Sequence, residues 1–135
     1  HGLLLYTEDG WMSVSICGAG RPPLPWDVSF RKLPESARAQ AYSSYFHYAG
    51  RYRVLEGDVI HDVAQSLNPN MAGTEQLRHA ELDGQTLVLS GKDEVGNVTR
   101  FHSLVWHRVA AAEATEDIDV QYRYRVSGTS ETSQP

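Results

Sequence analysis

The chain has 135 residues, enough for one domain with a single hydrophobic core. Its net charge of −5 argues against a nucleic-acid partner, because phosphate binding needs a basic surface. Apolar runs such as Leu3–Leu5 are far shorter than the roughly 20 residues of a membrane span, so no membrane partner is predicted. The single cysteine, Cys17, excludes an internal disulfide bond and favours a reducing, cytoplasmic location.

The first third of the chain predicts a β-hairpin, a loop and one short helix. Apolar and polar side chains alternate over residues 2–7 and 11–17, on either side of a Glu-Asp-Gly turn signal. Residues 18–26 are rich in glycine and proline, which excludes regular structure. From Pro34 to about residue 44, a proline in the first turn and several alanines favour a helix. A short helix in a long loop often acts as a lid over a site.

Residues 45–66 predict a hairpin with unusual side chains. Apolar residues alternate with polar ones on both sides of Gly57-Asp58, which we interpret as a two-residue turn. The stretch holds two histidines, three tyrosines and two arginines. A buried face that carries His and Tyr among Val is typical of a wall that faces a ligand.

Further strands are predicted in the second half of the chain, where apolar side chains again recur with a period of two. They cover residues 74–82, 85–91, 98–109 and 118–126, with a hairpin turn at 83–84, a loop at 93–97 and a linker or short helix at 110–117.

These elements predict an all-β fold with a single up-and-down antiparallel β-barrel. About eight strands joined by short turns close into a barrel wide enough to hold one small ligand. The predicted domain covers residues 1–126 and includes one short helix after the second strand. Residues 127–135, rich in Ser and Thr, predict a disordered tail.

Six short motifs follow one another along the chain: 2–14 (GLLLYTEDGWMSV), 48–52 (YAGRY), 59–63 (VIHDV), 66–69 (SLNP), 73–78 (GTEQLR) and 104–108 (LVWHR). In these motifs and their order, the chain resembles the small lipocalin-like domains of bacteria and fungi, which are calycin-type β-barrels. Each motif alone is weak, but the ordered set is fairly specific for the fold and much less so for the function.

Two departures from the family pattern concern the ends of the barrel. Members usually begin with a Gly-x-Trp strand before the first hairpin, and usually stop soon after the Trp-x-Arg strand. This chain lacks the former and adds the strand-like segment 118–126. We expect this segment to lie between residues 2–7 and 98–109 and so to close the barrel, because a barrel one strand short exposes two edges.

His61 is the leading candidate for chemistry. It alternates with Val59 and Val63, so if that face points inward, an imidazole lies in an apolar cavity and can act as acid or base. The alternative is a structural histidine bonded to a neighbouring side chain. Arg78 occupies a motif position of the family. Inside the barrel it would be an unpaired charge unless it met a carboxylate or polar ligand, whereas outside it would be a solvated surface residue.

Other candidates lie where the helix leads into the 45–55 strand. Tyr45, His47, Tyr48 and Tyr52 suit the orientation of a flat oxygenated ligand, although packing beneath the helix is the alternative. The predicted catalytic residues are His61, His47, Arg78 and Tyr52. The predicted ligand-binding residues are Tyr6, Met12, Val14, Tyr48, Leu104 and Trp106. By analogy with the family, Trp106 and Arg108 seal one end of the barrel by Arg–aromatic stacking.

Two functions are compatible with these features. The first is a binding module for a small, largely apolar or aromatic, polyketide-like molecule, with Arg78 and His61 anchoring its polar end. The second is a cofactor-free isomerase, cyclase or hydro-lyase of secondary metabolism, with His61 or His47 moving a proton and Arg78 or a Tyr stabilising an enolate-like oxygen.

Other chemistry has less support in the sequence. No cofactor is predicted, because the chain lacks a phosphate-binding loop and a nucleophile motif, and the histidine spacing predicts no metal. The Pro-rich loop with Trp26 is the only candidate for a protein-interaction surface, and the chain is compatible with a homodimer.

Overall fold

The computed structural model describes residues 1–109 and 122–126, and this part of the chain is almost entirely β-structure. Helical structure is limited to α1 (Glu35–Ser43) and the 3-10 turns η1 (Phe30–Lys32) and η2 (Pro69–Met71). The strands are β1 (Gly2–Tyr6), β2 (Trp11–Cys17), β3 (Tyr45–Leu55), β4 (Asp58–Ser66), β5 (Glu75–Asp83), β6 (Thr86–Val95), β7 (Val98–His107) and β8 (Tyr122–Val126).

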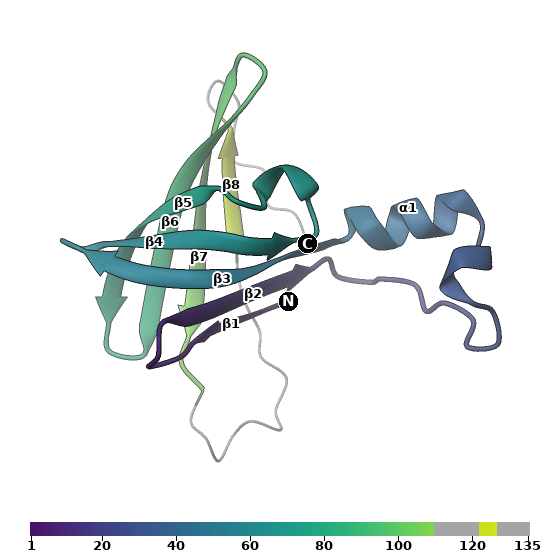
Figure 1. The fold of residues 1–135 in the computed structure, drawn as a ribbon, viewed down its shortest axis with the longest axis horizontal. Coiled ribbons are helices and arrows are strands. Elements are labelled where there is room, and N and C mark those ends of the chain that lie inside the picture. The colour runs from purple at the N-terminus through teal and green to yellow at the C-terminus, as the bar shows by residue number, and fades with distance from the viewer. Residues whose placement is uncertain (110–121, 127–135) are drawn as a thin grey trace.

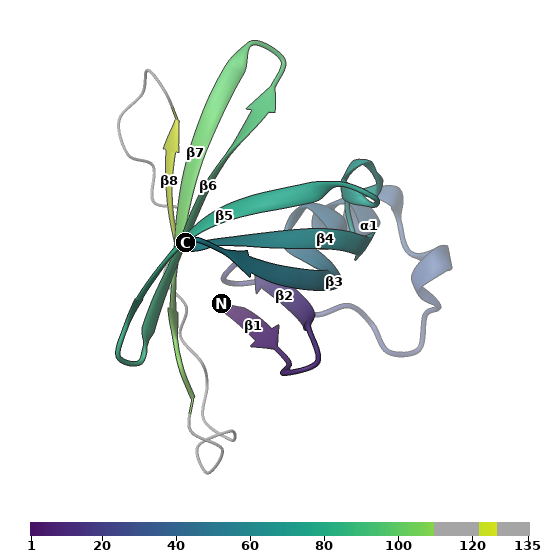
Figure 2. The same ribbon diagram turned by 60° about the vertical axis from the view of Figure 1, so that its left-hand side comes forward.

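Each strand pairs antiparallel with the next one along the chain, in the order β1 to β8 (Figure 1). This confirms the predicted up-and-down sheet and the single short helix after the second strand. The sheet is strongly curled: β1 to β5 wrap around a concave face, while β6 to β8 continue as a splayed wing (Figure 2). The result is a half-barrel, with α1 beyond the ends of β2 and β3 (Figure 1).

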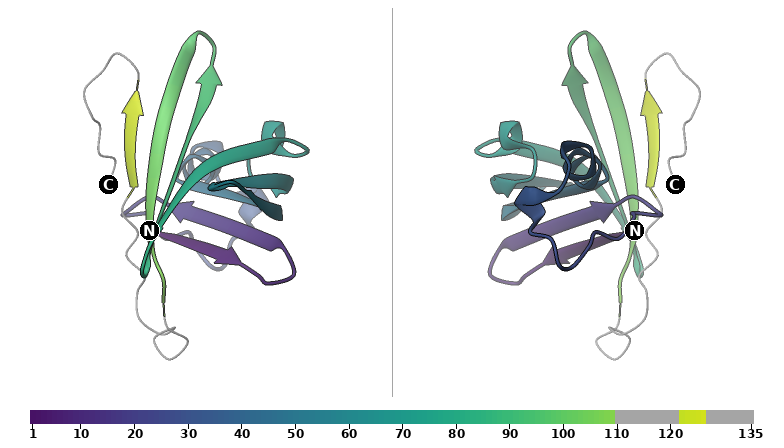
Figure 3. Two further views of the ribbon diagram at one scale, coloured as in Figure 1. Left: turned by 90° about the vertical axis from the view of Figure 1, so that its left-hand side faces the viewer. Right: turned by 90° about the vertical axis from the view of Figure 1, so that its right-hand side faces the viewer.

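The predicted closure of the barrel is only partly met. The backbone of β8 pairs with β7, with Arg100 opposite Val126, so the C-terminal segment adds a strand where expected. In the described residues, however, β1 and β8 are the two ends of the sheet order and do not pair with each other. Figure 3 shows β8 on one side of β7 and β1 on the other. The start of β1 meets β7 through a side chain instead, since a Cβ placed on Gly2 would be 3.2 Å from the Trp106 ring.

The hairpin of β3 and β4 departs from the prediction in its turn and its register. The turn residues are Glu56 and Gly57, one position earlier than predicted, and both have positive φ, as a two-residue hairpin turn requires. A bulge follows at Ala49/Gly50, where Gly50 approaches the β4 backbone so closely that a Cβ would lie 1.9 Å from the Asp62 carbonyl oxygen. Only glycine fits this crossing.

The predicted loop at residues 93–97 is wrong, because β6 continues to Val95 and the turn follows at residues 96–97. The charged residues there lack apolar alternation, which is why they resemble a loop. They are held in the ladder by cross-strand pairing instead, with Asp93 opposite Arg100 and bonded to it. The predicted disordered tail and the 110–117 linker lie outside the described residues.

The hydrophobic core lies on the concave face. Its buried members come from five strands: Met12, Val14, Tyr48, Val63, Leu89 and Trp106. They alternate with exposed or half-buried side chains, as a sheet with one covered face requires. In the described part of the chain, no helix is long and apolar enough to cross a membrane.

Candidate functional site

His61 points into the concave face, as predicted from its alternation with Val59 and Val63. Its side chain is only 1% exposed, and the two valines are buried on the same face of β4. The neighbouring Asp62 points the other way, where it forms an ion pair with Arg53 on the outer face. The strand therefore places a titratable imidazole among apolar side chains.

Two tyrosine hydroxyls flank the His61 ring. The Tyr6 hydroxyl oxygen lies 2.7 Å from Nε2, and the Tyr48 hydroxyl oxygen lies 2.8 Å from Nδ1. Tyr6 comes from β1 and Tyr48 from β3, so the curl of the sheet brings three strands to one point. Both ring nitrogens are thus occupied by neutral hydroxyls, not by carboxylates.

The site keeps these groups uncharged. Burial, together with the nearby positive charge of Arg78 and against a weaker opposing effect of Asp62, lowers the pKa of His61 from 6.5 to about 4. Burial likewise raises the pKa of Tyr48 above its ordinary value, although the charge of Arg78 and a hydrogen bond from it oppose this. At neutral pH the cluster is therefore a neutral imidazole between two neutral phenols.

These contacts fix the direction of the hydrogen bonds. A neutral imidazole has one donor and one acceptor nitrogen, and the guanidinium of Arg78 can only donate to Tyr48. The buried O–H of Tyr48 is therefore satisfied by donating to Nδ1 of His61, and Nε2–H donates to Tyr6. Among the described residues, the O–H of Tyr6 then has no acceptor, so it is the donor that the cluster offers to a ligand.

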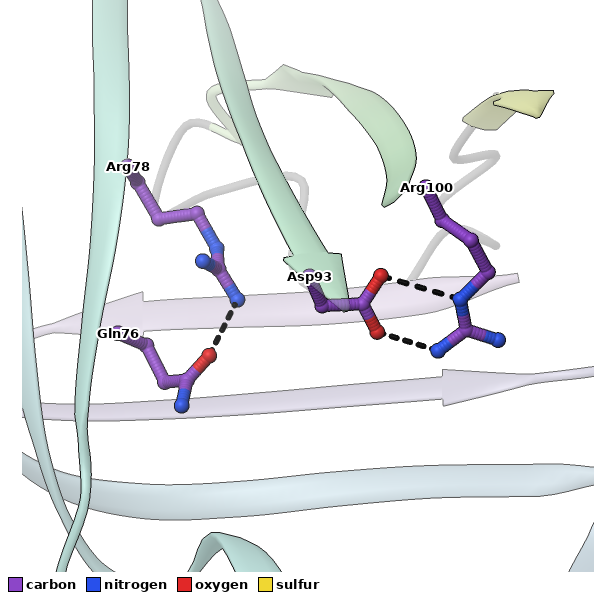
Figure 4. A network of polar contacts seen from close by, with 4 residues as sticks. All are labelled: Gln76, Arg78, Asp93 and Arg100. Atoms are coloured by element: carbon purple, nitrogen blue, oxygen red, sulfur yellow. Dashed lines mark hydrogen bonds and ion pairs between the residues drawn. The ribbon is translucent and has the colours of Figure 1, made fainter. Parts of the chain in front are cut away.

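Arg78 also lies on the concave face, so the surface alternative for this residue is wrong. It is 7% exposed, and it donates to the Leu77 carbonyl oxygen at 2.8 Å and to the Gln76 side-chain oxygen at 3.3 Å. Figure 4 shows Arg78 and Gln76 facing the separate pair of Asp93 and Arg100. Arg78 thus joins the cluster of His61 and the tyrosines as its cationic member.

Tyr52 supports the cluster without directing its hydroxyl into it. Its ring lies edge-on to the Tyr6 ring, with centroids 4.7 Å apart, and its hydroxyl donates to the Thr7 carbonyl oxygen. Tyr52 therefore holds Tyr6 in position beside His61.

The structure does not bring His47 to this cluster. Its Nδ1 lies 3.0 Å from the Ser15 hydroxyl, and its ring stacks on Tyr45. Because Tyr48 points inward, the adjacent His47 must point to the opposite face of β3. The predicted pairing of His47 with His61 in one site is therefore not supported by the geometry.

The predicted apolar lining surrounds the cluster. Met12, Val14 and Trp106 are buried on the concave face, and Leu104 and Tyr6 pack against them. The predicted stacking of Arg108 on Trp106 is wrong, because β7 ends at His107 and the Arg108 side chain is exposed beyond it. In the described residues, cation–π contacts join Arg51 to Trp11 and Arg21 to Tyr45.

Two residues of the concave face were not predicted as site residues. His102 lies opposite Gly91, and a Cβ on Gly91 would be 3.0 Å from His102 Nε2 and 2.9 Å from Arg78 Nη1. Burial, with the charge of Arg78, lowers the pKa of His102 to about 4. Strand alternation could have identified His102 as an inward residue, because it alternates with Leu104 and Trp106. The described side chains include no group of three or more His, Cys, Asp or Glu placed to hold a metal ion.

The up-and-down antiparallel sheet, curled around an apolar concave face, is a half-barrel of the lipocalin-like type, a fold that can bind ligands. The sequence profile of the lipocalin-like domain matches residues 1–109, and the chain belongs to this family. Comparison with curated proteins gave no match, and comparison with solved structures gave none either.

Proposed function

We propose that the concave face binds a small, largely apolar or aromatic molecule whose oxygen-bearing end meets the cluster of Tyr6, His61 and Arg78. The observation that carries this proposal is the position of a hydrogen-bonded polar cluster on an otherwise apolar inner face. Binding sites of small molecules combine apolar walls with a few placed polar groups in this way. The O–H of Tyr6 would orient a carbonyl or hydroxyl oxygen, and the apolar side chains would hold the body of the molecule.

Two measurements test this proposal. Native mass spectrometry of the purified protein is expected to show a co-purified small molecule. Titration with the neutral fluorescent probe N-phenyl-1-naphthylamine is expected to give saturable enhancement. Leu104→Trp, which fills space on the concave face, should weaken probe binding, whereas Leu77→Trp, at an outward position that is 56% exposed, should not. Absence of both a bound molecule and probe enhancement would contradict the proposal.

A second candidate function is cofactor-free proton transfer, as in an isomerase, cyclase or hydro-lyase of secondary metabolism. The observation that favours it is the neutral His61 within hydrogen-bonding distance of two tyrosines and close to a buried cation. Such a cluster can stabilise an enolate-like oxygen through the O–H of Tyr6 and the charge of Arg78.

Deuterium exchange separates this candidate from simple binding. The co-purified molecule is incubated with the protein in heavy water, and an enzyme of this class should introduce deuterium next to the activated carbonyl. His61→Gln should abolish the exchange while binding persists. If a molecule binds the unaltered protein but no deuterium exchange occurs, the function is binding without catalysis.

The cytoplasmic location and the homodimer remain predictions.

A further inference from the structure

Arg78 is a buried cation without an anionic partner. All its acceptors are neutral: the Leu77 carbonyl oxygen, the Gln76 amide oxygen and the Tyr48 hydroxyl. Among the side chains that the structure describes, no carboxylate forms an ion pair with it. Burying an unpaired charge is costly, so a guanidinium that is 7% exposed is expected to acquire an anion when the protein is in use.

The carboxylates that line the same hollow as Arg78 already have other partners. A hollow of about 850 Å³ adjoins the guanidinium, and three acidic side chains line it. Each of these is engaged elsewhere: Asp93 with Arg100, Asp58 with His79, and Glu75 with Arg53. Two cationic side chains that line this hollow, Arg78 and Lys92, form no ion pair with the described carboxylates, and of these two only Arg78 is buried.

Gly91 lets the side chains of Arg78 and His102 approach one point of the β6 backbone. Any larger residue would place its Cβ 2.9 Å from Arg78 Nη1 and 3.0 Å from His102 Nε2. Both side chains line the hollow, and His102 supplies a second polar ring nitrogen. One step further along the same face, Leu89 lies opposite Leu104, and Leu87 lies opposite Trp106. A cationic point therefore adjoins a row of apolar side chains.

We infer that Arg78, Gly91 and His102 form an anion subsite that binds the carboxylate of an amphipathic organic acid. This inference rests on the proposed binding function and narrows its ligand class. The guanidinium fork matches a carboxylate in two parallel hydrogen bonds. The apolar body of the acid would extend along Leu89, Leu104 and Trp106. A single buried guanidinium suits one negative charge better than the multiple charges of a phosphate.

Isothermal titration with 2-naphthoate and its methyl ester tests this subsite, because the two probes share their apolar body and differ in charge. The unaltered protein is expected to bind the acid at least about tenfold more tightly than the ester. Arg78→Gln should weaken binding of the acid more than binding of the ester, so that the preference for the acid is lost. Arg53→Gln is the matched control, because Arg53 lies on the outer face, and it should retain the preference.

Gly91→Ala provides a second variant that keeps the charge. Its Cβ meets the far end of the flexible Arg78 side chain, so the fold can adapt by moving the guanidinium. The acid preference should fall at least about threefold. Equal affinity of acid and ester in the unaltered protein would overturn the anion subsite but leave the proposed function intact. If Arg78→Gln still prefers the acid, the anion subsite does not lie at Arg78. If neither probe binds the unaltered protein, the result counts against the proposed binding function itself.

Discussion

The hydroxyl of Tyr48 lies 2.8 Å from Nδ1 of His61, and the position of Arg78 beside Tyr48 favours one direction for the hydrogen bonds of this cluster. Arg78 can only donate to Tyr48, so Tyr48 donates to His61 and His61 donates to Tyr6. One guanidinium on β5 thereby sets the tautomer of an imidazole on β4 and the free donor on β1. Such chains of hydrogen bonds reinforce one another in a buried setting.

Removal of the Tyr48 hydroxyl should destabilise the protein. In Tyr48→Phe, Nδ1 of His61 and a donor of Arg78 lose their partner in a buried site, so the free energy of unfolding should fall by about 1–3 kcal/mol. Urea denaturation measures the change. Tyr42→Phe is the control: Tyr42 is 50% exposed and its hydroxyl makes a 3.3 Å bond, so the loss there should stay below about 0.5 kcal/mol. Equal losses in the two variants would show that the buried hydroxyl of Tyr48 contributes no more to stability than an exposed one.

The stability of the protein should fall as the pH drops below 6.5. The pKa of His61 is about 4 in the folded protein and 6.5 when unfolded, so the unfolded chain binds more protons between these values. The contribution of His61 to the free energy of unfolding is therefore fully present above pH 6.5 and is lost as the pH falls toward 4. From about pH 7.5 to about pH 5, His61 alone should account for roughly 2 kcal/mol.

His61→Gln isolates this contribution, since it removes the titrating group and keeps a donor and an acceptor. The pH dependence of its free energy of unfolding should be flatter than that of the unaltered protein over this range. His107→Gln, at an exposed position, is the matched control and should retain the full slope. A slope that is the same in His61→Gln and the unaltered protein would show that His61 is protonated equally in both states.

Gly50→Ala should prevent folding or cost at least about 3 kcal/mol. Its Cβ would lie 1.9 Å from the backbone oxygen of Asp62 and 2.8 Å from the nitrogen of Ala64, and backbone atoms cannot rotate away. Thermal unfolding monitored by circular dichroism measures the effect. Gly18→Ala is the control, because its nearest neighbour would be 3.7 Å away, at ordinary contact distance. A Gly50→Ala protein as stable as Gly18→Ala would argue against this close strand crossing.

Glu56→Asn should stabilise the protein by about 0.5 kcal/mol. Glu56 is the only non-glycine residue with positive φ among the described residues, at 48°, and Asn accepts this conformation more readily. The same change at Glu8, in the first hairpin turn, has no such strain to relieve and should leave stability unchanged. Urea denaturation of the two variants side by side gives the comparison.

Strand alternation predicted the faces of the sheet because burial of one face requires a period of two. It favoured an inward position for His61 and the apolar lining, and it left Arg78 open between the two faces. The same rule could have separated His47 from Tyr48, since adjacent residues on a strand point to opposite faces. It also could have included His102. The bulge at Gly50 depends on a backbone approach between two strands, which no local pattern encodes. The extension of β6 depends on Asp93 meeting Arg100, and the direction of the hydrogen bonds depends on a fourth residue, Arg78, far along the chain.

The contact between Gly2 and Trp106 has a consequence for the size of what the half-barrel can hold. In the described residues, no hydrogen-bonded ladder joins β1 to the opposite side of the sheet, so backbone geometry does not set the girth of the concavity. The Trp106 ring, which lies close to the start of β1, contributes to this width instead. A smaller or larger residue at position 106 would therefore change the size of molecule that the concave face admits, without a change in strand pairing.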